Sequence, residues 1–206
     1  MNHLAHFHLS FDQPDLIIGN WVADFIQHSE VGSFSKEVQQ GIFLHRFIDS
    51  FTDQHHLMNQ SAARLRPYLG KYARVFVDIF NDHLLASSWE HWSNLPIKDY
   101  SRQIYYILEL RTADLPVNLR EQTNKMISAD WLNGYSSKEG MQFVIEKFKQ
   151  RMRNNAYFQQ AKPDLDGALE YFFEEKPHFY HDFQAFYEEL QASAYKFIAT
   201  PLPHLS

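Results

Sequence analysis

The sequence predicts an all-α protein, and both its composition and its periodicity support this fold class. Glycine accounts for 7 of 206 residues, about half of its average share, which leaves few tight turns for sandwiches or Rossmann folds. Apolar residues recur at helical spacing along nearly the whole chain, and no stretch alternates as a β-strand does. Because this length is typical of one domain, we expect residues 1–206 to form a single compact domain of about eight helices.

Prolines and capping residues set the expected helix boundaries. Pro14 can begin the first helix, Ser35 can cap the second, Thr52 or Asp53 can cap the third, and Pro67 can begin the fourth. The expected helices of the first half are about 14–29, 35–50, 53–65 and 67–92. Those of the second half are about 98–112, 116–133, 137–154, a short one between Pro163 and Pro177, and 178–199.

The charge and the residue types exclude several functional classes. Lys and Arg number 19 against 25 Asp and Glu, with no basic run, which argues against nucleic-acid binding because that binding depends on phosphate neutralisation. The absence of cysteine excludes disulfides, thiol catalysis and thiolate metal sites. No apolar stretch approaches the roughly 18 residues that a membrane span needs, and the first residues do not resemble a signal peptide. We therefore expect a cytoplasmic protein with neither nucleic acid nor membrane as its partner.

One predicted helix carries two carboxylates in an apolar setting. Of the six residues from Val75 onward only Asp78 is polar, and Asp82 follows on the same face at i+4. A helix that is apolar on nearly all faces is buried, and a buried carboxylate needs an ion pair or a metal. A salt bridge to an arginine such as Arg46 or Arg64 and a metal site both remain open here.

Two further predicted helices repeat this spacing of Asp and His. His45 and Asp49 lie four residues apart beside an apolar stripe, and Asp24 lies among apolar neighbours between Asn20 and His28. His45 taken alone is equally consistent with a hydrogen-bonded core histidine. Salt bridges do not readily explain three helices with inward Asp or His. Mixed ligands that are rich in oxygen suit hard or borderline divalent ions such as Mn²⁺ or Mg²⁺, and nothing in the sequence supports Fe²⁺ or Zn²⁺ specifically.

Other catalytic templates do not fit the chain. A di-iron bundle needs helical Glu-x-x-His pairs, but Glu175-x-x-His178 contains Pro177. The chain has no phosphate-binding Gly-x-x-x-x-Gly-Lys loop, no Gly-x-Ser-x-Gly elbow and no His-Glu-x-x-His motif.

Short motifs follow one another in order along the first 92 residues. They are Met1-Asn2, Leu4-Ala5-His6, Gly19-Asn20, Ala23-Asp24, Gly41-Ile42, Leu44-His45-Arg46, Ile48-Asp49, Phe51-Thr52-Asp53, His55, Asp78, Asp82-His83, Leu85-Ala86 and Trp89. With these motifs the chain resembles the acyl-carrier-protein phosphodiesterases, also called acyl-carrier-protein hydrolases, a branch of the HD phosphohydrolase superfamily. Two departures are His56, where the family often has proline, and the order Asp82-His83, which reverses the superfamily's usual His-Asp doublet.

The resemblance implies an HD-phosphohydrolase-like fold and a definite reaction. The reaction is hydrolysis of the phosphodiester that joins 4′-phosphopantetheine to a serine of holo acyl carrier protein, with Mn²⁺ as the usual metal. His83 or His6 would protonate the departing serine oxygen or orient the water. Arg46 would clamp the phosphate, although a structural pair with Asp49 or Asp78 fits it equally well. The expected metal ligands are Asp24, His45, Asp49, Asp78 and Asp82.

An acidic carrier protein would need a basic docking face on this acidic chain. Two candidate faces exist in the sequence. The one that we favour consists of Arg64, Arg66, Lys71 and Arg74. The other, which a helix C-terminus favours in any case, consists of Lys147, Lys149, Arg151 and Arg153.

Two other functions remain open at the level of sequence. An HD-type phosphohydrolase acting on a small nucleotide or phosphomonoester would need no carrier protein. A non-enzymatic helical binding module would bind no metal and would keep its function after Asp78→Asn or Asp82→Asn.

Overall fold

The computed structural model describes residues 1–200, and helices make up nearly all of that span. It contains no β-strand in these residues, which confirms the all-α prediction. The α-helices are α1 (His3–His8), α2 (Pro14–Val22), α3 (Lys36–Gln54), α4 (His56–Leu69), α5 (Ala73–Ser87), α6 (Ile97–Leu110), α7 (Val117–Ser128), α8 (Trp131–Gly134), α9 (Lys138–Met152), α10 (Ala156–Ala161), α11 (Leu165–Glu174) and α12 (Lys176–Ala199). The 3₁₀ turns are η1 (Ala23–Phe25), η2 (His28–Ser33), η3 (Gly70–Tyr72), η4 (Trp89–His91) and η5 (Thr112–Asp114).

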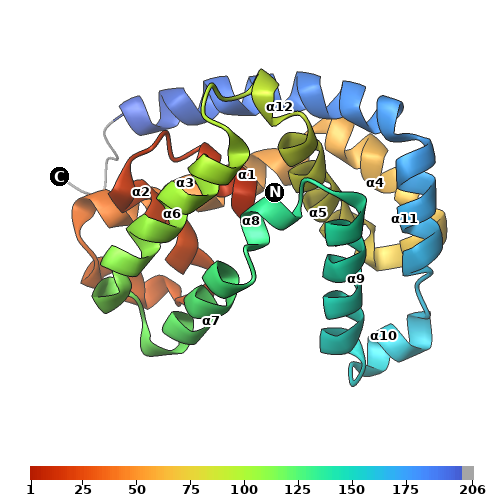
Figure 1. Ribbon diagram of the computed structural model, residues 1–206, viewed down its shortest axis with the longest axis horizontal. Helices are drawn as coiled ribbons and strands as arrows, with labels where there is room; N and C mark the ends of the chain where they lie inside the picture. The colour runs from red at the N-terminus through yellow and green to blue at the C-terminus, as the bar shows by residue number, and fades with distance from the viewer. Residues whose placement is uncertain (201–206) are drawn as a thin grey trace.

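The helices pack around a central short helix, α1, whose residues Leu4, Ala5 and Phe7 are almost fully buried. The long helix α12 runs along one edge of the molecule and packs on α3 and α4 (Figure 1). Helices α6 and α7 lie at one end, and α9, α10 and α11 lie at the other. None of the helices in residues 1–200 combines the length and the apolar character that crossing a membrane requires.

Several helix boundaries differ from those expected, so that the helices outnumber the eight or so predicted. In the 14–29 segment the α-helix ends at Val22, the 3₁₀ turn η1 follows, and the chain becomes extended at Ile26. The prediction that Pro67 begins a helix is wrong, because Pro67 lies inside α4. The helix ends instead before Gly70, which adopts a positive φ of 53°. The 116–133 segment divides into α7 and α8 at Asp130, which is left-handed. The short helices α1 and α10 were not among the expected elements.

Helices α2 and α3 cross with their backbones in contact at two glycines. A Cβ atom on Gly19 would lie 2.3 Å from the Val38 carbonyl oxygen and 2.6 Å from the Gly41 Cα, and one on Gly41 would lie 2.6 Å from the Leu16 carbonyl oxygen. All of these neighbours are backbone atoms, so only glycine allows the two helices to approach this closely. The crossing places Asn20 and Asp24 beside the middle of α3.

We expect Gly41→Ala to lower the free energy of unfolding by about 2–3 kcal/mol or more, because two backbones must separate to admit one methyl group. Urea denaturation monitored by circular dichroism measures this change. Gly32→Ala is the matched control, since nothing lies within 4 Å of the added Cβ, and it should shift stability by only a few tenths of a kcal/mol. Equal midpoints for the Gly41→Ala variant and the wild type would show that the crossing tolerates a side chain.

Candidate metal and catalytic site

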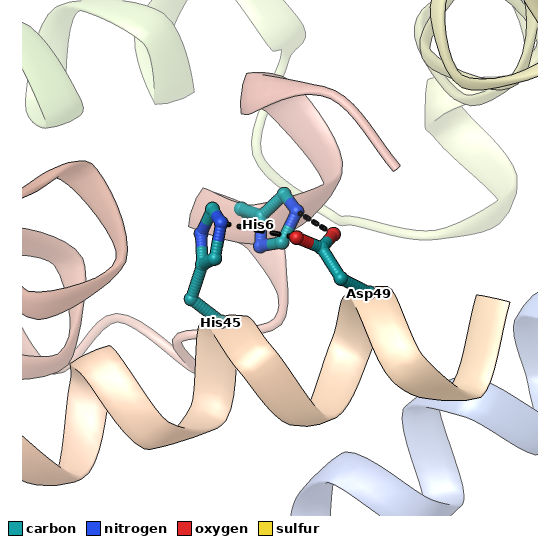
Figure 2. Close-up of side chains that lie close together, drawn as sticks. All are labelled: His6, His45 and Asp49. Atoms are coloured by element: carbon teal, nitrogen blue, oxygen red, sulfur yellow. Dashed lines mark hydrogen bonds and ion pairs between the residues drawn. The ribbon is translucent and has the colours of Figure 1, made fainter. Parts of the chain in front are cut away.

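Three side chains from α1 and α3 converge on one point: His6, His45 and Asp49. The Nε2 atom of His6 lies 3.1 Å from Oδ1 of Asp49, and the Nε2 atom of His45 lies 3.2 Å from Oδ2 of the same carboxylate (Figure 2). The two imidazole rings stack with their centroids 4.1 Å apart. One potential ligand atom from each residue lies within 4.8 Å of the others, as a mononuclear metal site would require. We call these three residues the His6–His45–Asp49 cluster.

The helix α3 supplies two members of the cluster through simple helical geometry. Residues four apart project from the same face of a helix, so His45 and Asp49 point to one side of α3 (Figure 2). The Ser35 side chain caps the helix by accepting from the Val38 N–H, as the sequence predicts. His45 is buried, while the Asp49 side chain is 45% exposed, so solvent or substrate can reach the carboxylate.

Asp82 holds α1 in place rather than joining the cluster. It is fully buried, and its two carboxylate oxygens accept hydrogen bonds from the backbone N–H groups of Leu4, at 2.8 Å, and Ala5, at 3.3 Å. A carboxylate at a helix N-terminus satisfies unpaired N–H groups and complements the helix dipole. Burial raises the pKa of Asp82 to about 7 even though these bonds oppose the rise. The sequence identifies Asp82 as a residue with an unusual environment, but that environment is the start of α1.

Asn20 determines which nitrogen of His6 carries a proton. The Asn20 amide nitrogen donates to Ser10 Oγ at 2.9 Å and to the Leu16 carbonyl oxygen at 3.3 Å. Its Oδ1 atom therefore faces Nδ1 of His6, 3.0 Å away, and accepts the proton of that nitrogen. Burial and the neighbouring charge of His45 lower the pKa of His6, and its Nε2 atom points at the Asp49 carboxylate, 3.1 Å away.

The charges within the cluster are strongly coupled. Burial alone would lower the pKa of His45, but hydrogen bonds to the Asp24 and Asp49 carboxylates raise it to about 9. Partial burial would raise the pKa of Asp49, but its bonds to His45 and His6 hold it well below the usual range. The hydrogen bond to His45 likewise lowers the pKa of Asp24. In the form described, His45 is therefore an imidazolium between two carboxylates.

Asp24 and Asp78 border the cluster, but neither side chain is buried among apolar residues, whereas the sequence led us to expect that both would be. Asp24 lies in η1 with a side chain 54% exposed, and its Oδ1 atom is 3.1 Å from Nε2 of His45. Asp78 is 37% exposed and lies 3.0 Å from the amino nitrogen of Met1, which is 3.8 Å from Oδ1 of Asp49. The exposure of Asp24 is a correction to the sequence analysis and follows from the end of α2 at Val22.

The arginine pairs considered for these carboxylates do not form within residues 1–200. Nη1 of Arg46 lies 3.0 Å from Nδ1 of His28, and Arg64 pairs with Asp182 at 2.5 Å. The alternative in which Arg46 pairs with Asp49 or Asp78 is therefore not realised. The alternative in which Arg46 or Arg64 neutralises Asp78 or Asp82 is not realised either. The carboxylates beside the cluster instead face imidazoles and an amino group.

His83 lies apart from the His6–His45–Asp49 cluster. Its Nδ1 atom is 2.8 Å from the Tyr135 carbonyl oxygen, and its ring meets Phe172 and Phe173 edge-on. Burial lowers the pKa of His83 to about 4, so the ring is neutral. The structure thus places His6 of the two expected acid–base histidines in the cluster and leaves His83 in an aromatic environment.

The basic face favoured from the sequence is partly engaged in contacts within the chain. Besides the pair between Arg64 and Asp182, Arg74 donates to the Asp53 carboxylate and to Asn59 Oδ1. Lys71 lies over the Tyr157 ring at 4.4 Å. Arg66 is exposed and has no ion-pair partner within the described part of the chain.

A cleft beside the cluster was not apparent from the sequence. It has a volume of about 840 Å³ and is lined by residues of α1, α5, α7, α8 and α9, with Asp78 and His3 among them. His3 packs between Trp21 and Trp131, and burial lowers its pKa to about 4. No signal in the sequence distinguished His3 from an ordinary histidine of an N-terminal helix.

Comparison with known proteins identifies relatives along nearly the whole chain. The model of the family described as acyl carrier protein phosphodiesterase matches residues 1–190. Proteins with that name are 28% identical in Klebsiella pneumoniae (strain 342) and 27% identical in Enterobacter sp. (strain 638), each covering 81% of this chain and 86% of the relative. The protein of that name in Salmonella agona is 25% identical over 87% of this chain and 94% of its own. No solved structure matches this one significantly. The chain belongs to the acyl carrier protein phosphodiesterase family and is a phosphodiesterase.

Proposed function

We propose that this chain removes 4′-phosphopantetheine from the serine of holo acyl carrier protein, using a divalent metal bound by His6, His45 and Asp49. The family model and the names of the relatives support the carrier protein as the substrate. The observation that carries the metal is the convergence of the cluster. One potential ligand atom each of His6, His45 and Asp49 lies within 4.8 Å of the others, and the Asp49 side chain is 45% exposed, so an ion can reach it.

The donor set of the cluster fits a divalent cation. Two imidazole nitrogens and one carboxylate are ligands that borderline ions such as Mn²⁺ and Fe²⁺ accept, and we propose Mn²⁺ with Mg²⁺ and Fe²⁺ as alternatives. Asp24 is hydrogen-bonded to His45, so it can serve as a further metal ligand or orient the His45 ring. When bound, the ion would polarise a phosphoryl oxygen and lower the pKa of a water.

Residues around the cluster have separate roles in this proposal. Asn20 holds His6 in the tautomer that presents Nε2, and both nitrogens of His6 are then engaged, so we assign His6 to the metal and not to proton transfer. Asp82 fixes the start of α1 and with it the position of His6. Asp78 borders the cluster through the Met1 amino group and is a candidate second-ion or substrate contact. The phosphate clamp by Arg46, the HD-like fold and the cytoplasmic location stay predictions.

We expect an intact-mass assay to show loss of one phosphopantetheine group from holo carrier only with metal and intact Asp49. Asp49→Asn should slow the reaction at least about 100-fold, because the substitution removes one ligand and its charge. Asp53→Asn is the matched control, since Asp53 lies on the same helix but pairs with Arg74, and it should retain activity. Full activity in EDTA would contradict the metal site. Bound metal without any mass change would favour a small-molecule phosphohydrolase, and neither metal nor mass change would favour a binding module.

Metal binding should release about one proton near pH 7.5, because the metal displaces the proton of His45, whose pKa is raised to about 9. The apparent affinity for the metal should therefore rise with pH up to about 9.

In the metal-free protein the raised pKa of His45 stabilises the fold below the ordinary histidine pKa of about 6.5. This stabilisation is lost as the pH rises through 9. Calorimetry in two buffers of different ionisation enthalpy measures the proton count. A binding enthalpy that does not depend on the buffer would mean that His45 loses no proton when the metal binds.

Asn20→Leu should lower metal affinity by about 10- to 100-fold, because His6 loses the acceptor that fixes its tautomer. Ser10→Ala is the control, since it removes a partner of Asn20 but leaves the bond between Asn20 and His6. Its affinity should stay within about threefold of the wild type. Equal affinities for Asn20→Leu and the wild type would show that His6 is oriented by other contacts.

A further inference from the structure

The cleft beside the cluster is lined by residues of α7 and of α9, among others. We call the part of its lining that is formed by α8, the start of α1 and Asp78 the inner end. Asp78 lies at that inner end, and Met1 connects Asp78 to Asp49 through contacts of 3.0 and 3.8 Å. A molecule that fills the inner end of the cleft therefore lies next to the metal ligands.

The rim of the cleft carries three cations, Lys125 on α7 and Lys147 and Arg151 on α9. We call them the cationic rim. Lys147 and Arg151 are four residues apart, so they share one face of α9. Lys149 lies on a different face, where it bonds to Glu146 and Asp166. Of the basic run at the end of α9, two members thus line the cleft while a third belongs to an internal ion-pair network.

The two α9 cations of the rim are available to an outside partner. Within residues 1–200, no carboxylate lies within ion-pair distance of Lys147 or Arg151. Each instead lies over an aromatic ring of its own helix, Lys147 over Phe143 at 5.1 Å and Arg151 over Phe148 at 5.4 Å. Such contacts hold a cation in place without neutralising it. Lys125 pairs only with the exposed Glu121 on its own helix, an interaction that is weak in water.

Apolar side chains are also exposed in the lining of this cleft. Phe143 is 50% exposed and Val75 is 41% exposed, and Trp131 lines the same cleft. Aromatic surface surrounded by cations is a common composition for the centre of a protein interface. The net charge of the chain is −6, so a local positive surface is what an acidic protein would need to approach it.

Building on the proposed function, we propose that the acidic surface of the carrier protein next to its modified serine docks over this cleft. The scissile phosphodiester then lies at the inner end beside the His6–His45–Asp49 cluster. Carboxylates of the carrier contact Lys147, Arg151 and Lys125, and apolar side chains of the carrier cover Phe143. This docking surface differs from the face of Arg64, Arg66, Lys71 and Arg74 that the sequence favours, where Arg64 and Arg74 already have partners.

The test compares two double charge reversals, each of one Lys and one Arg at exposed positions. Lys147→Glu with Arg151→Glu alters the cleft, and Arg66→Glu with Lys71→Glu alters the other face. For hydrolysis of holo carrier, we expect the cleft variant to raise KM at least about 10-fold with kcat within about threefold, and to weaken the dependence of KM on salt. The Arg66/Lys71 variant should match the wild type.

Further measurements separate docking from folding and from the chemistry. Both variants should keep the wild-type melting temperature, metal affinity and rate on a small phosphodiester such as bis(p-nitrophenyl) phosphate. Phe143→Ala should raise KM about 5- to 10-fold. A raised KM in the Arg66/Lys71 variant alone, or an unchanged KM in both, would overturn the docking surface.

Failure of the proposed function would be visible in the wild type itself, as no release of phosphopantetheine from holo carrier. Docking is then still measured by calorimetry of apo carrier binding to the wild type and to the two variants. Weaker binding only in the cleft variant supports the docking surface, and equal binding by both variants rejects it.

Discussion

The close contact between Gly19 and Gly41 is the constraint on which the candidate site depends. Because neither glycine has a side chain, α2 and α3 approach until their backbones are in contact. Only at this separation does the end of α2 place Asn20 against His6 and lead into Asp24 against His45. A larger residue at either position would move the residues that orient the histidines away from those that would hold the metal.

His6, which with His45 and Asp49 completes the proposed metal site, comes from a helix that is too short to be stable alone. Helix α1 spans only His3–His8, and Asp82 of α5 receives the N–H groups of its first turn. The buried carboxylate of Asp82 thus has a positioning role. It fixes where α1 begins and hence where His6 meets α3. Stability and function are linked here, because the interactions that keep α1 folded also place a proposed metal ligand.

Some of this arrangement could be predicted from the sequence. The i, i+4 spacing of His45 and Asp49 lies within one helix, so local periodicity was sufficient to place both on one face. His6 was identified only through the resemblance, since its contact with Asp49 joins residues 43 positions apart. Asp82 was correctly expected to be buried, but periodicity cannot distinguish a metal ligand from a carboxylate that caps another helix.

Other features depend on tertiary structure that composition and periodicity do not encode. Asp24 was placed on a helix that ends at Val22, so its exposure was missed. The cleft combines residues of α1, α5 and α7–α9. Lys147 and Arg151 belong to the second basic face found in the sequence, but spacing could not show that they line a cleft together with His3 and Lys125. The all-α class follows from a helical periodicity that extends along nearly the whole chain. The family was identified from motifs in the first 92 residues, and the family model extends the match to residues 1–190.

The central claim is that a divalent ion sits between His6, His45 and Asp49. The most direct measurement is a crystal structure with Mn²⁺, with diffraction data collected at the manganese absorption edge. We expect an anomalous peak between Nε2 of His6, Nε2 of His45 and the Asp49 carboxylate, with Asp82 still bonded to the start of α1. A peak at Asp78 and Asp82 instead, or no peak at full Mn²⁺ saturation, would contradict it.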